Sequence, residues 1–122
     1  MILGIGVDTV EVARIACAME SARFMERIFT PAERELIAEK GAQTAAGRWA
    51  AKEAVAKAMG CGISLCPPGC VEILPDEMGK PVAVLSGAAL ERFTQMGAKT
   101  LHLSISHDGG HAVAFALLEG EA

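Results

Sequence analysis

Residues 48–60 read RWAAKEAVAKAMG and belong to an alanine-rich stretch that runs from about Thr44 to Met59. Its composition and spacing predict a helix, and Gly60 and Gly62 predict where that helix ends. At 100° per residue, one face collects only small or β-branched side chains: Ala50, Ala51, Ala54, Val55 and Ala58. A face of this kind lets a helix approach a neighbouring element closely. We therefore expect this helix to pack tightly against another part of the chain.

The charged residues of the same helix fall on two further sectors. Arg48 and Lys52 share one sector, while Glu53 and Lys57 share another. A glutamate four residues before a lysine is a favourable surface pair worth ~0.2–0.5 kcal/mol. On periodicity alone, Glu53 and Lys57 are such a solvated pair. The alternative is that they serve a binding or catalytic site.

The first forty residues predict a strand followed by helical segments. The run ILGIGV (2–7) is apolar with β-branched residues and predicts a buried strand that ends at Asp8. Apolar residues then recur at helical spacing from Thr9, and a second segment covers roughly 22–28. A helix start follows, with Thr30 as N-cap, Pro31 at N1 and Glu33 completing a capping box.

Residues 61–122 predict two hairpins and one helix. CVEILPD (70–76) and KPVAVLS (80–86) flank a turn at Gly79, and a helix covers 86–97. TLHLSISH (100–107) and HAVAFALLE (111–119) flank the turn DGG. The order β-α-α-α-β-β-α-β-β predicts an α+β fold, a single compact domain over residues 1–122 with helices packed on a mostly antiparallel sheet.

Composition narrows the possible partners. The chain has 52% apolar residues and a net charge of −4, which argues against general binding of nucleic acid or membrane surfaces. Small residues supply most of the apolar share, so the core is modest and association between subunits is expected. The start MILGIGVD lacks a basic leader and predicts no signal peptide, hence a cytoplasmic protein with reduced cysteines. The four cysteines form no CxxC pair and predict no zinc site.

Two other segments carry candidate functional residues. Asp8 ends an apolar run, and its carboxylate either caps the following helix or binds a ligand. In SISH (104–107), Ser106 and His107 point to opposite sides of an extended chain. This alternation excludes a Ser-His-Asp triad made from residues 106–108. The alternative is that the serines are edge-strand hydroxyls and that His107 is a turn residue.

Four segments in this order and spacing carry a family resemblance: GIGVD (4–8), RIFTPAE (27–33), GRWAAKEAVAKAMGCGI (47–63) and SISH (104–107). The chain resembles the bacterial holo-[acyl-carrier-protein] synthases, the small class of 4′-phosphopantetheinyl transferases, over essentially its whole length. The resemblance implies an enzyme that moves the phosphopantetheine arm of coenzyme A onto a serine of apo acyl carrier protein and releases adenosine 3′,5′-bisphosphate. It also implies the fold of that family and a homotrimer with active sites between subunits.

The resemblance assigns roles to individual residues. Asp8 and Glu53 match the two carboxylates that hold Mg²⁺ against the coenzyme A pyrophosphate, and Lys57 matches a lysine at the phosphates. Glu53 and Lys57 are thus the catalytic candidates, with a water near Glu53 as the base. The expected contacts to the nucleotide end of coenzyme A are Lys40, Arg48, Ser106 and His107, and Lys52 extends the basic surface. Arg14 matches a residue that docks the acidic carrier. Trp49 stands where the family often has Phe.

Two other functions remain open at the level of sequence. The first is a metal-dependent hydrolase that uses Asp8, Glu53 and His107, or the pair His107 and His111 on either side of the DGG turn. The second is a non-catalytic module that binds coenzyme A or a nucleotide, in which Asp8 would only cap a helix. A hydrolase would act without a carrier, and a binding module would transfer nothing.

Overall fold

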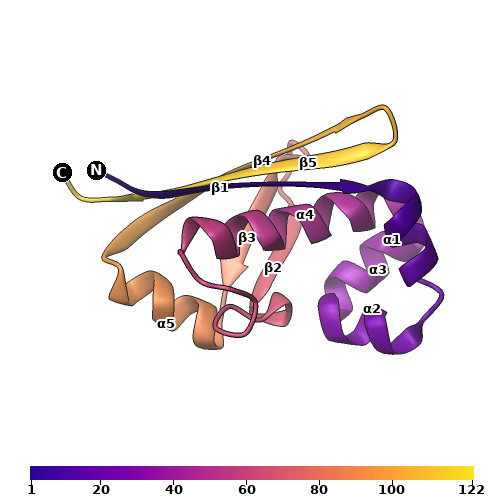
Figure 1. The fold of residues 1–122 in the computed structure, drawn as a ribbon, viewed down its shortest axis with the longest axis horizontal. Helices are drawn as coiled ribbons and strands as arrows, with labels where there is room; N and C mark the ends of the chain where they lie inside the picture. The colour runs from indigo at the N-terminus through magenta and orange to yellow at the C-terminus, as the bar shows by residue number, and fades with distance from the viewer.

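A three-stranded antiparallel sheet forms one layer of the molecule. The computed structural model describes residues 1–122. Strands β1 (Ile2–Glu11), β4 (Ala98–Asp108) and β5 (His111–Gly120) pair in the order β1-β5-β4, so the first and last strands of the chain are neighbours. β4 and β5 form the hairpin predicted around DGG. Figure 1 shows this sheet along the top of the molecule, with the two termini close together.

Helix α4 (Ala42–Ala58) lies lengthwise against the inner face of the sheet (Figure 1). The approach is so close that a Cβ atom at Gly6 would lie 2.0 Å from the carbonyl oxygen of Ala54. A Cβ atom at Gly4 would lie equally near the carbonyl oxygen of Ala58. Glycine in the strand and alanine in the helix thus bring two backbones into contact. The tight packing predicted for the alanine-rich helix is confirmed.

Three short helices cover one end of α4. They are α1 (Val12–Ala18), α2 (Ala22–Ile28) and α3 (Pro31–Lys40). The start of α3 has the predicted capping box: the Thr30 side chain accepts a hydrogen bond from the Glu33 amide, and the Thr30 amide donates to Glu33 Oε1. This box satisfies two amides that would otherwise lack partners at the start of the helix.

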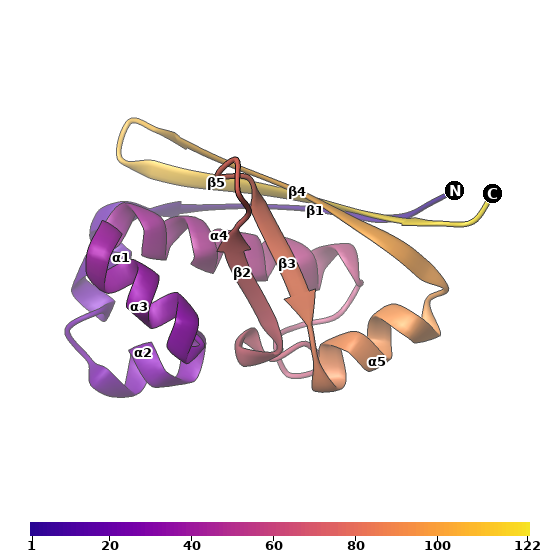
Figure 2. The same cartoon turned by 180° about the vertical axis from the view of Figure 1, so that it is seen from behind.

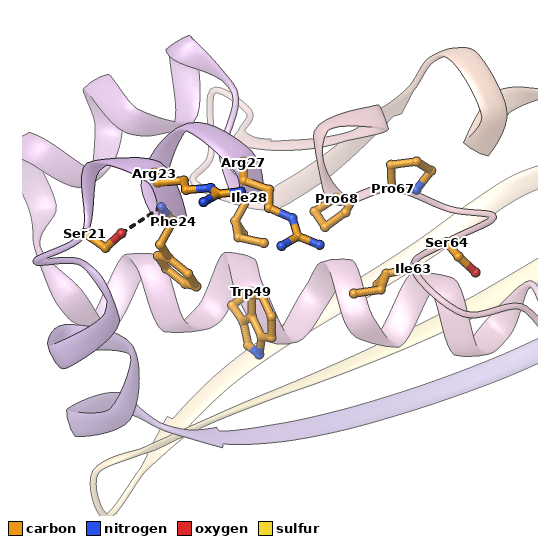
Figure 3. Close-up of a pocket in the computed structure, with 10 residues that line it drawn as sticks. All are labelled: Ser21, Arg23, Phe24, Arg27, Ile28, Trp49, Ile63, Ser64, Pro67 and Pro68. Carbon is orange, nitrogen blue, oxygen red and sulfur yellow. Dashed lines mark hydrogen bonds between the residues drawn. The ribbon is translucent and has the colours of Figure 1, made fainter.

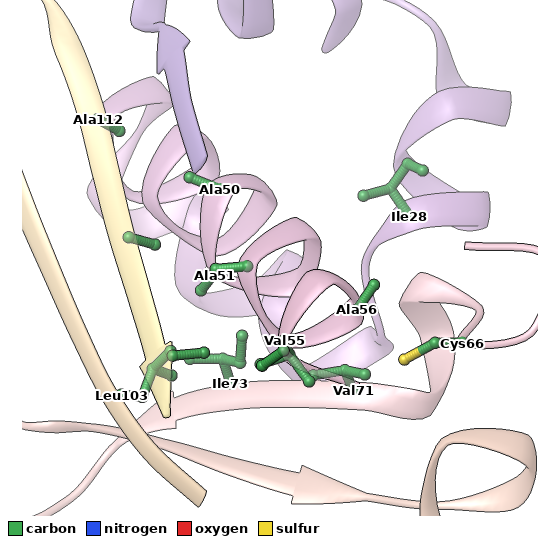
Figure 4. Packing of buried hydrophobic residues seen from close by; sticks show 14 of the residues in the cluster. Ile28, Ala50, Ala51, Val55, Ala56, Cys66, Val71, Ile73, Leu103 and Ala112 are labelled. Atoms are coloured by element: carbon green, nitrogen blue, oxygen red, sulfur yellow. The ribbon is translucent and has the colours of Figure 1, made fainter. Parts of the chain in front are cut away.

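A second, two-stranded sheet packs on another side of α4. The hairpin of β2 (Val71–Pro75) and β3 (Pro81–Leu85) turns at Gly79, whose φ is 84°. The short helix η1 (Pro68–Cys70) precedes it and α5 (Gly87–Gln95) follows it. Figure 2 shows the hairpin crossing α4. Around α4, the core contains side chains from both sheets (Figure 4): Val71, Ile73, Leu103 and Ala112.

The α+β fold is confirmed, while three details of the prediction are wrong. β1 continues to Glu11, so the first helix begins at Val12 and its N-cap is Glu11 rather than Asp8. Segment 22–28 is a helix of its own, so four helices precede the first hairpin instead of three.

None of the helices is both long and apolar enough to cross a bilayer.

The third error concerns the burial of β1. The sequence predicts a buried strand at residues 2–7, but β1 is an edge strand, and Ile5 and Val7 are 60% and 53% exposed. Successive residues of a strand face opposite sides. Gly4, Gly6 and Asp8 therefore face α4, while the β-branched residues between them face outward.

Candidate active site

Asp8 and Lys57 meet where β1 crosses the C-terminal half of α4. The Nζ atom of Lys57 lies 3.1 Å from Asp8 Oδ1 and donates a 3.0 Å hydrogen bond to the carbonyl oxygen of Val7. The Asp8 side chain is 18% exposed, and the Lys57 side chain is 53% exposed. Asp8 is therefore held in a partly buried position, while Lys57 reaches it from the solvent side.

Glu53 lies one helical turn before Lys57 and is half-buried. Burial raises the pKa of the Glu53 carboxyl, the negative charge of Asp8 raises it further, and Lys57 opposes the shift. The two carboxylates are thus close enough to repel each other. Lys57 pairs with Asp8 and not with Glu53, so the surface i,i+4 pair considered for Glu53 and Lys57 is not formed. The alternative role of Asp8 as a helix cap is excluded, because α1 begins after Glu11.

This arrangement fits a Mg²⁺ ion better than a metal held only by protein. No group of three or more His, Cys, Asp or Glu side chains is placed to hold a metal ion. Mg²⁺ is usually bound by one or two carboxylates together with waters and substrate phosphates. Asp8 and Glu53 supply two carboxylates whose mutual repulsion a divalent cation would relieve. These two residues could therefore hold the ion only with substrate oxygens or water completing its shell.

Three of the residues predicted to contact a nucleotide gather near the N-terminal end of α4. Lys40 and Arg48 line one shallow groove between α3, α4 and the β2–β3 hairpin. His107 approaches the same end of α4 from β4, with Nε2 2.8 Å from the carbonyl oxygen of Gln43. Burial lowers the pKa of the Arg48 guanidinium, and Arg48 Nε donates to the carbonyl oxygen of Ile73. Asp76 and Glu77 line the opposite wall of the groove, so it carries both signs of charge.

Ser106 is not brought to these residues within one subunit. A Cβ atom at Gly47 of α4 would lie 3.1 Å from Ile105 Cγ2 and 3.3 Å from His107 Nε2, so both residues face the helix. Ser106 lies between them in β4 and is exposed on the opposite, outer face of the sheet. Any contact of Ser106 with the same ligand as His107 would need a second subunit.

The position of His107 argues against the hydrolase considered above. His107 is hydrogen-bonded at Gln43, ten residues before Glu53 on the same helix. With a rise of 1.5 Å per residue, Gln43 lies about 15 Å, and Gly47, which His107 also approaches, about 9 Å along the helix axis from Glu53. This separation argues against the form of hydrolase in which His107 and Glu53 share one metal ion.

Lys52 does not extend a basic surface, contrary to the prediction. Its side chain is 1% exposed, and its ammonium lies 2.7 Å from Glu33 Oε1. The same nitrogen donates to the carbonyl oxygens of Pro68 and Val71. Lys52 and Arg48 do share one sector of α4 as predicted, but that sector faces α3 and β2. Helical spacing predicts that Arg48 and Lys52 share a sector, but it does not predict which parts of the chain cover that sector.

A groove with an apolar floor and basic residues at its wall lies between α2, α4 and the loop 61–70 (Figure 3). Its volume is about 590 Å³. We call it the α2 groove. Trp49 lies between the α2 side chains and the loop, and Arg27 extends across the groove (Figure 3). The lining residues are Ser21, Arg23, Phe24, Arg27, Ile28, Trp49, Ile63, Ser64, Pro67 and Pro68. Sequence reasoning missed this groove, although the spacing of Arg23, Phe24 and Arg27 on one short helix was a usable signal.

Two further features are exposed on the surface of the molecule: Arg14 on α1 and the apolar outer face of the three-stranded sheet. Arg14 is exposed on α1 and forms no ion pair within the chain, but it does not line the α2 groove. On the outer face, Ile5, Val7 and Phe115 are 60%, 53% and 42% exposed and lie in paired or neighbouring strands. Large apolar side chains gathered in this way are typical of surfaces that another subunit covers.

Comparison with known proteins identifies the family. The family model described as the 4′-phosphopantetheinyl transferase superfamily matches residues 4–116. This chain belongs to that superfamily. The holo-[acyl-carrier-protein] synthase of Trichlorobacter lovleyi is 45% identical over 98% of both chains. That of Desulforudis audaxviator is 47% identical over 98% of this chain and 95% of its own.

Solved structures agree with the sequence relatives. A holo-(acyl-carrier-protein) synthase from Bacillus anthracis, in complex with CoA (3′,5′-ADP), superposes with a TM-score of 0.84 at 37% identity, covering 99% of both chains. The Helicobacter pylori enzyme in complex with coenzyme A gives a TM-score of 0.84 at 32% identity, covering 94% of this chain and 99% of its own. The predicted resemblance and the predicted enzyme class, a phosphopantetheinyl transferase, are confirmed.

Proposed function

We propose that this chain transfers the 4′-phosphopantetheine arm of coenzyme A to a serine of an apo acyl carrier protein, in a Mg²⁺-dependent reaction that releases adenosine 3′,5′-bisphosphate. The observation that carries the proposal is the meeting of Asp8, Glu53 and Lys57 where β1 touches α4. Membership of the superfamily supports the same reaction, and so do the coenzyme A complexes of similar proteins.

Asp8 and Glu53 would hold the metal. Mg²⁺ bound there would act as a Lewis acid on the pyrophosphate and offset the charge that develops on its oxygens. Lys57 contributes a positive charge from the solvent side of the site, where phosphate oxygens can reach it. Because its side chain is half-exposed, Lys57 can turn from Asp8 to a phosphate with little loss of packing. A water beside Glu53 accepts the proton of the attacking serine.

The nucleotide end of coenzyme A is proposed to contact Lys40, Arg48 and His107. Arg48 and the part of α4 that His107 contacts lie about 8 to 15 Å along the helix axis from Glu53, and Lys40 ends α3 just before α4 begins. That separation is compatible with a ligand that has its pyrophosphate at one cluster and its 3′-phosphate at the other. Ser106 joins this set only across a subunit boundary.

We further propose that the chain is a homotrimer and that the carrier docks on α1 and α2. The exposed apolar face formed by Ile5, Val7 and Phe115 supports burial between subunits. For the carrier, Arg23 and Arg27 line an apolar groove and Arg14 is exposed on α1, the preceding helix, and such a surface suits an acidic amphipathic helix. The net charge of −4 gives no overall attraction to an acidic partner, so such a local patch is needed.

A mass measurement on the carrier tests the function. The protein is incubated with coenzyme A, Mg²⁺ and an apo acyl carrier protein, and the carrier is then weighed by mass spectrometry. We expect the carrier to gain one phosphopantetheine group, and a carrier whose acceptor serine is changed to alanine to gain none. Breakdown of coenzyme A with no gain on the carrier would point to a hydrolase instead.

A further inference from the structure

A buried ion pair lies beneath the α2 groove. Lys52 and Glu33 have side chains that are 1% and 0% exposed, with 2.7 Å between Lys52 Nζ and Glu33 Oε1. Together with the carbonyl oxygens of Pro68 and Val71, this contact uses all three donors of the ammonium. Burying a charged pair costs solvation free energy and is often no more stabilising than apolar packing. The pair therefore calls for an explanation beyond stability.

The first wall of the groove depends on Lys52. Residues 61–70 connect α4 to β2 and contribute Ile63, Ser64, Pro67 and Pro68 to the groove. The backbone hydrogen bonds of residues 62–69 run within the loop itself, for example from Cys66 to Gly62 and from Cys70 to Pro67. The bond from Lys52 Nζ to the Pro68 carbonyl ties this loop to α4, and the amide of Val71, at the start of β2, donates to the same carbonyl.

The second wall depends on Glu33. Its Oε1 accepts a hydrogen bond from the amide of Thr30, just after the end of α2. Its Oε2 accepts one from the amide of Ile73 in β2. The Lys52 ammonium also lies 5.9 Å from the centre of the Phe29 ring, next to Ile28 of the groove. One carboxylate thus joins the end of α2 to the ammonium that holds the loop.

The floor of the groove comes from the same turn of α4. Trp49 lies three residues before Lys52, and its ring centre is 5.9 Å from that of Phe24 on α2. In Figure 3, Trp49 lies on α4 between Phe24 on one side and Ile63 on the other. The ion pair therefore anchors both walls to the helix that provides the floor.

We propose that the Lys52–Glu33 ion pair is a positioning device that sets the separation of the two walls of the α2 groove and thereby the affinity for the carrier protein. The inference rests on the proposed function, because the groove is taken as part of the docking surface. Both side chains are fully buried, so we expect neither to touch coenzyme A or the reacting atoms. Loss of the pair should loosen the 61–70 loop and weaken carrier binding while leaving the handling of coenzyme A intact.

The test compares steady-state kinetics of wild type with Lys52→Met and with the double variant E33Q/K52M. Lys52→Met leaves the Glu33 charge buried without a partner, whereas the double variant removes both charges. The double variant can still be measured if Lys52→Met alone does not fold. In either folded variant we expect the KM for the carrier to rise by roughly 10-fold. The KM for coenzyme A and the kcat at saturating carrier should change less than twofold.

The control is Leu118→Ala, which leaves a cavity at a buried residue of β5 that does not line the groove. It is measured well below its melting temperature. It should lower stability without changing the ratio of the two KM values. Hydrogen exchange gives a second readout: amides of residues 61–66 should exchange faster in E33Q/K52M than in wild type, while those of β5 should not.

The outcomes separate the inference from the proposed function. Failure of wild type to modify any carrier would overturn the function. Normal transfer by wild type, with variants in which both KM values rise equally or neither changes, would overturn the positioning role alone. Unchanged exchange in the loop would also overturn it.

Discussion

The ammonium of Lys57 lies 3.1 Å from the carboxylate of Asp8, although 49 residues separate them in the sequence. The contact lies where β1 packs against α4, beside Gly4 and Gly6, which touch the backbone of the helix. It places one positive and two negative charges together, because Glu53 stands one turn before Lys57. The chemistry proposed for this chain depends on the close packing of that strand and helix.

Gly6→Ala tests whether close packing is required. The added Cβ atom would lie 2.0 Å from the Ala54 carbonyl oxygen, so the strand must move away from the helix. We expect the free energy of unfolding in urea to fall by about 3 kcal/mol or more. Transfer activity should fall as well, since Asp8 moves with the strand. Gly69→Ala is the control, because a Cβ atom at Gly69 meets nothing within 4 Å. Equal stability of the two variants would refute the packing argument.

The charge of Glu53 should cost stability when no metal is bound. Burial and the charge of Asp8 raise the pKa of Glu53 in the folded protein. A raised folded-state pKa favours folding at low pH, and that contribution is lost as the pH rises through the raised pKa. Glu53→Gln in EDTA should therefore melt at a higher temperature than wild type at pH 7.5, and the difference should shrink toward pH 4.

The control for this pH series is Glu35→Gln, an exposed glutamate of α3. Thermal unfolding followed by circular dichroism from pH 4 to pH 8 gives the comparison. Two results would be evidence against repulsion between the two carboxylates. One is a Glu53→Gln variant that melts below wild type at pH 7.5, and the other is a difference in melting temperature that stays the same at every pH.

Arg14→Glu tests the docking surface for the carrier. The variant loses an ion pair with the acidic carrier and gains a repulsion from it. The KM for the carrier should therefore rise by about 10-fold or more. The KM for coenzyme A should barely change, and added salt should weaken carrier binding by wild type more than by the variant. Lys99→Glu makes the same charge change on β4 and should leave both values unaltered. Equal increases in both KM values for Arg14→Glu would show that Arg14 supports the site rather than docking.

The oligomer can be tested at the outer face of the sheet. Phe115→Lys places a charge among the exposed apolar side chains of β1 and β5, and we expect sedimentation to show a monomer in place of a trimer. Met78→Lys, at a site 91% exposed on the β2–β3 turn, should remain a trimer. A monomeric wild type with full activity at assay concentration would contradict the proposed assembly.

The sequence predicted the elements whose signals are local. The capping box of Thr30 and Glu33, the turn at Gly79 and the end of α4 near Gly60 each depend on a few adjacent residues. The close approach of α4 to another element was also predictable, since the methyl group of alanine is too small to keep two backbones far apart.

Partners that are distant in sequence could not be predicted from local patterns, and only the family resemblance placed Asp8 with Glu53 and Lys57. Glu53 and Lys57 looked like a surface pair because their spacing matches one, yet Lys57 pairs with the Asp8 carboxylate on strand β1. Lys52 looked exposed because nothing local reveals that α3 and β2 cover it. β1 looked buried because an apolar run does not show whether a sheet or a second subunit covers its outer face.

The most direct test of the central claim is the rate of transfer to the carrier as a function of Mg²⁺ for Asp8→Asn and Glu53→Gln. Each amide keeps the shape of the side chain and removes the charge that would hold the metal. We expect both variants, folded as wild type by circular dichroism, to lose at least about 100-fold in rate at saturating Mg²⁺. Glu35→Gln should match wild type. Near-normal rates in both Asp8→Asn and Glu53→Gln would contradict the proposed active site.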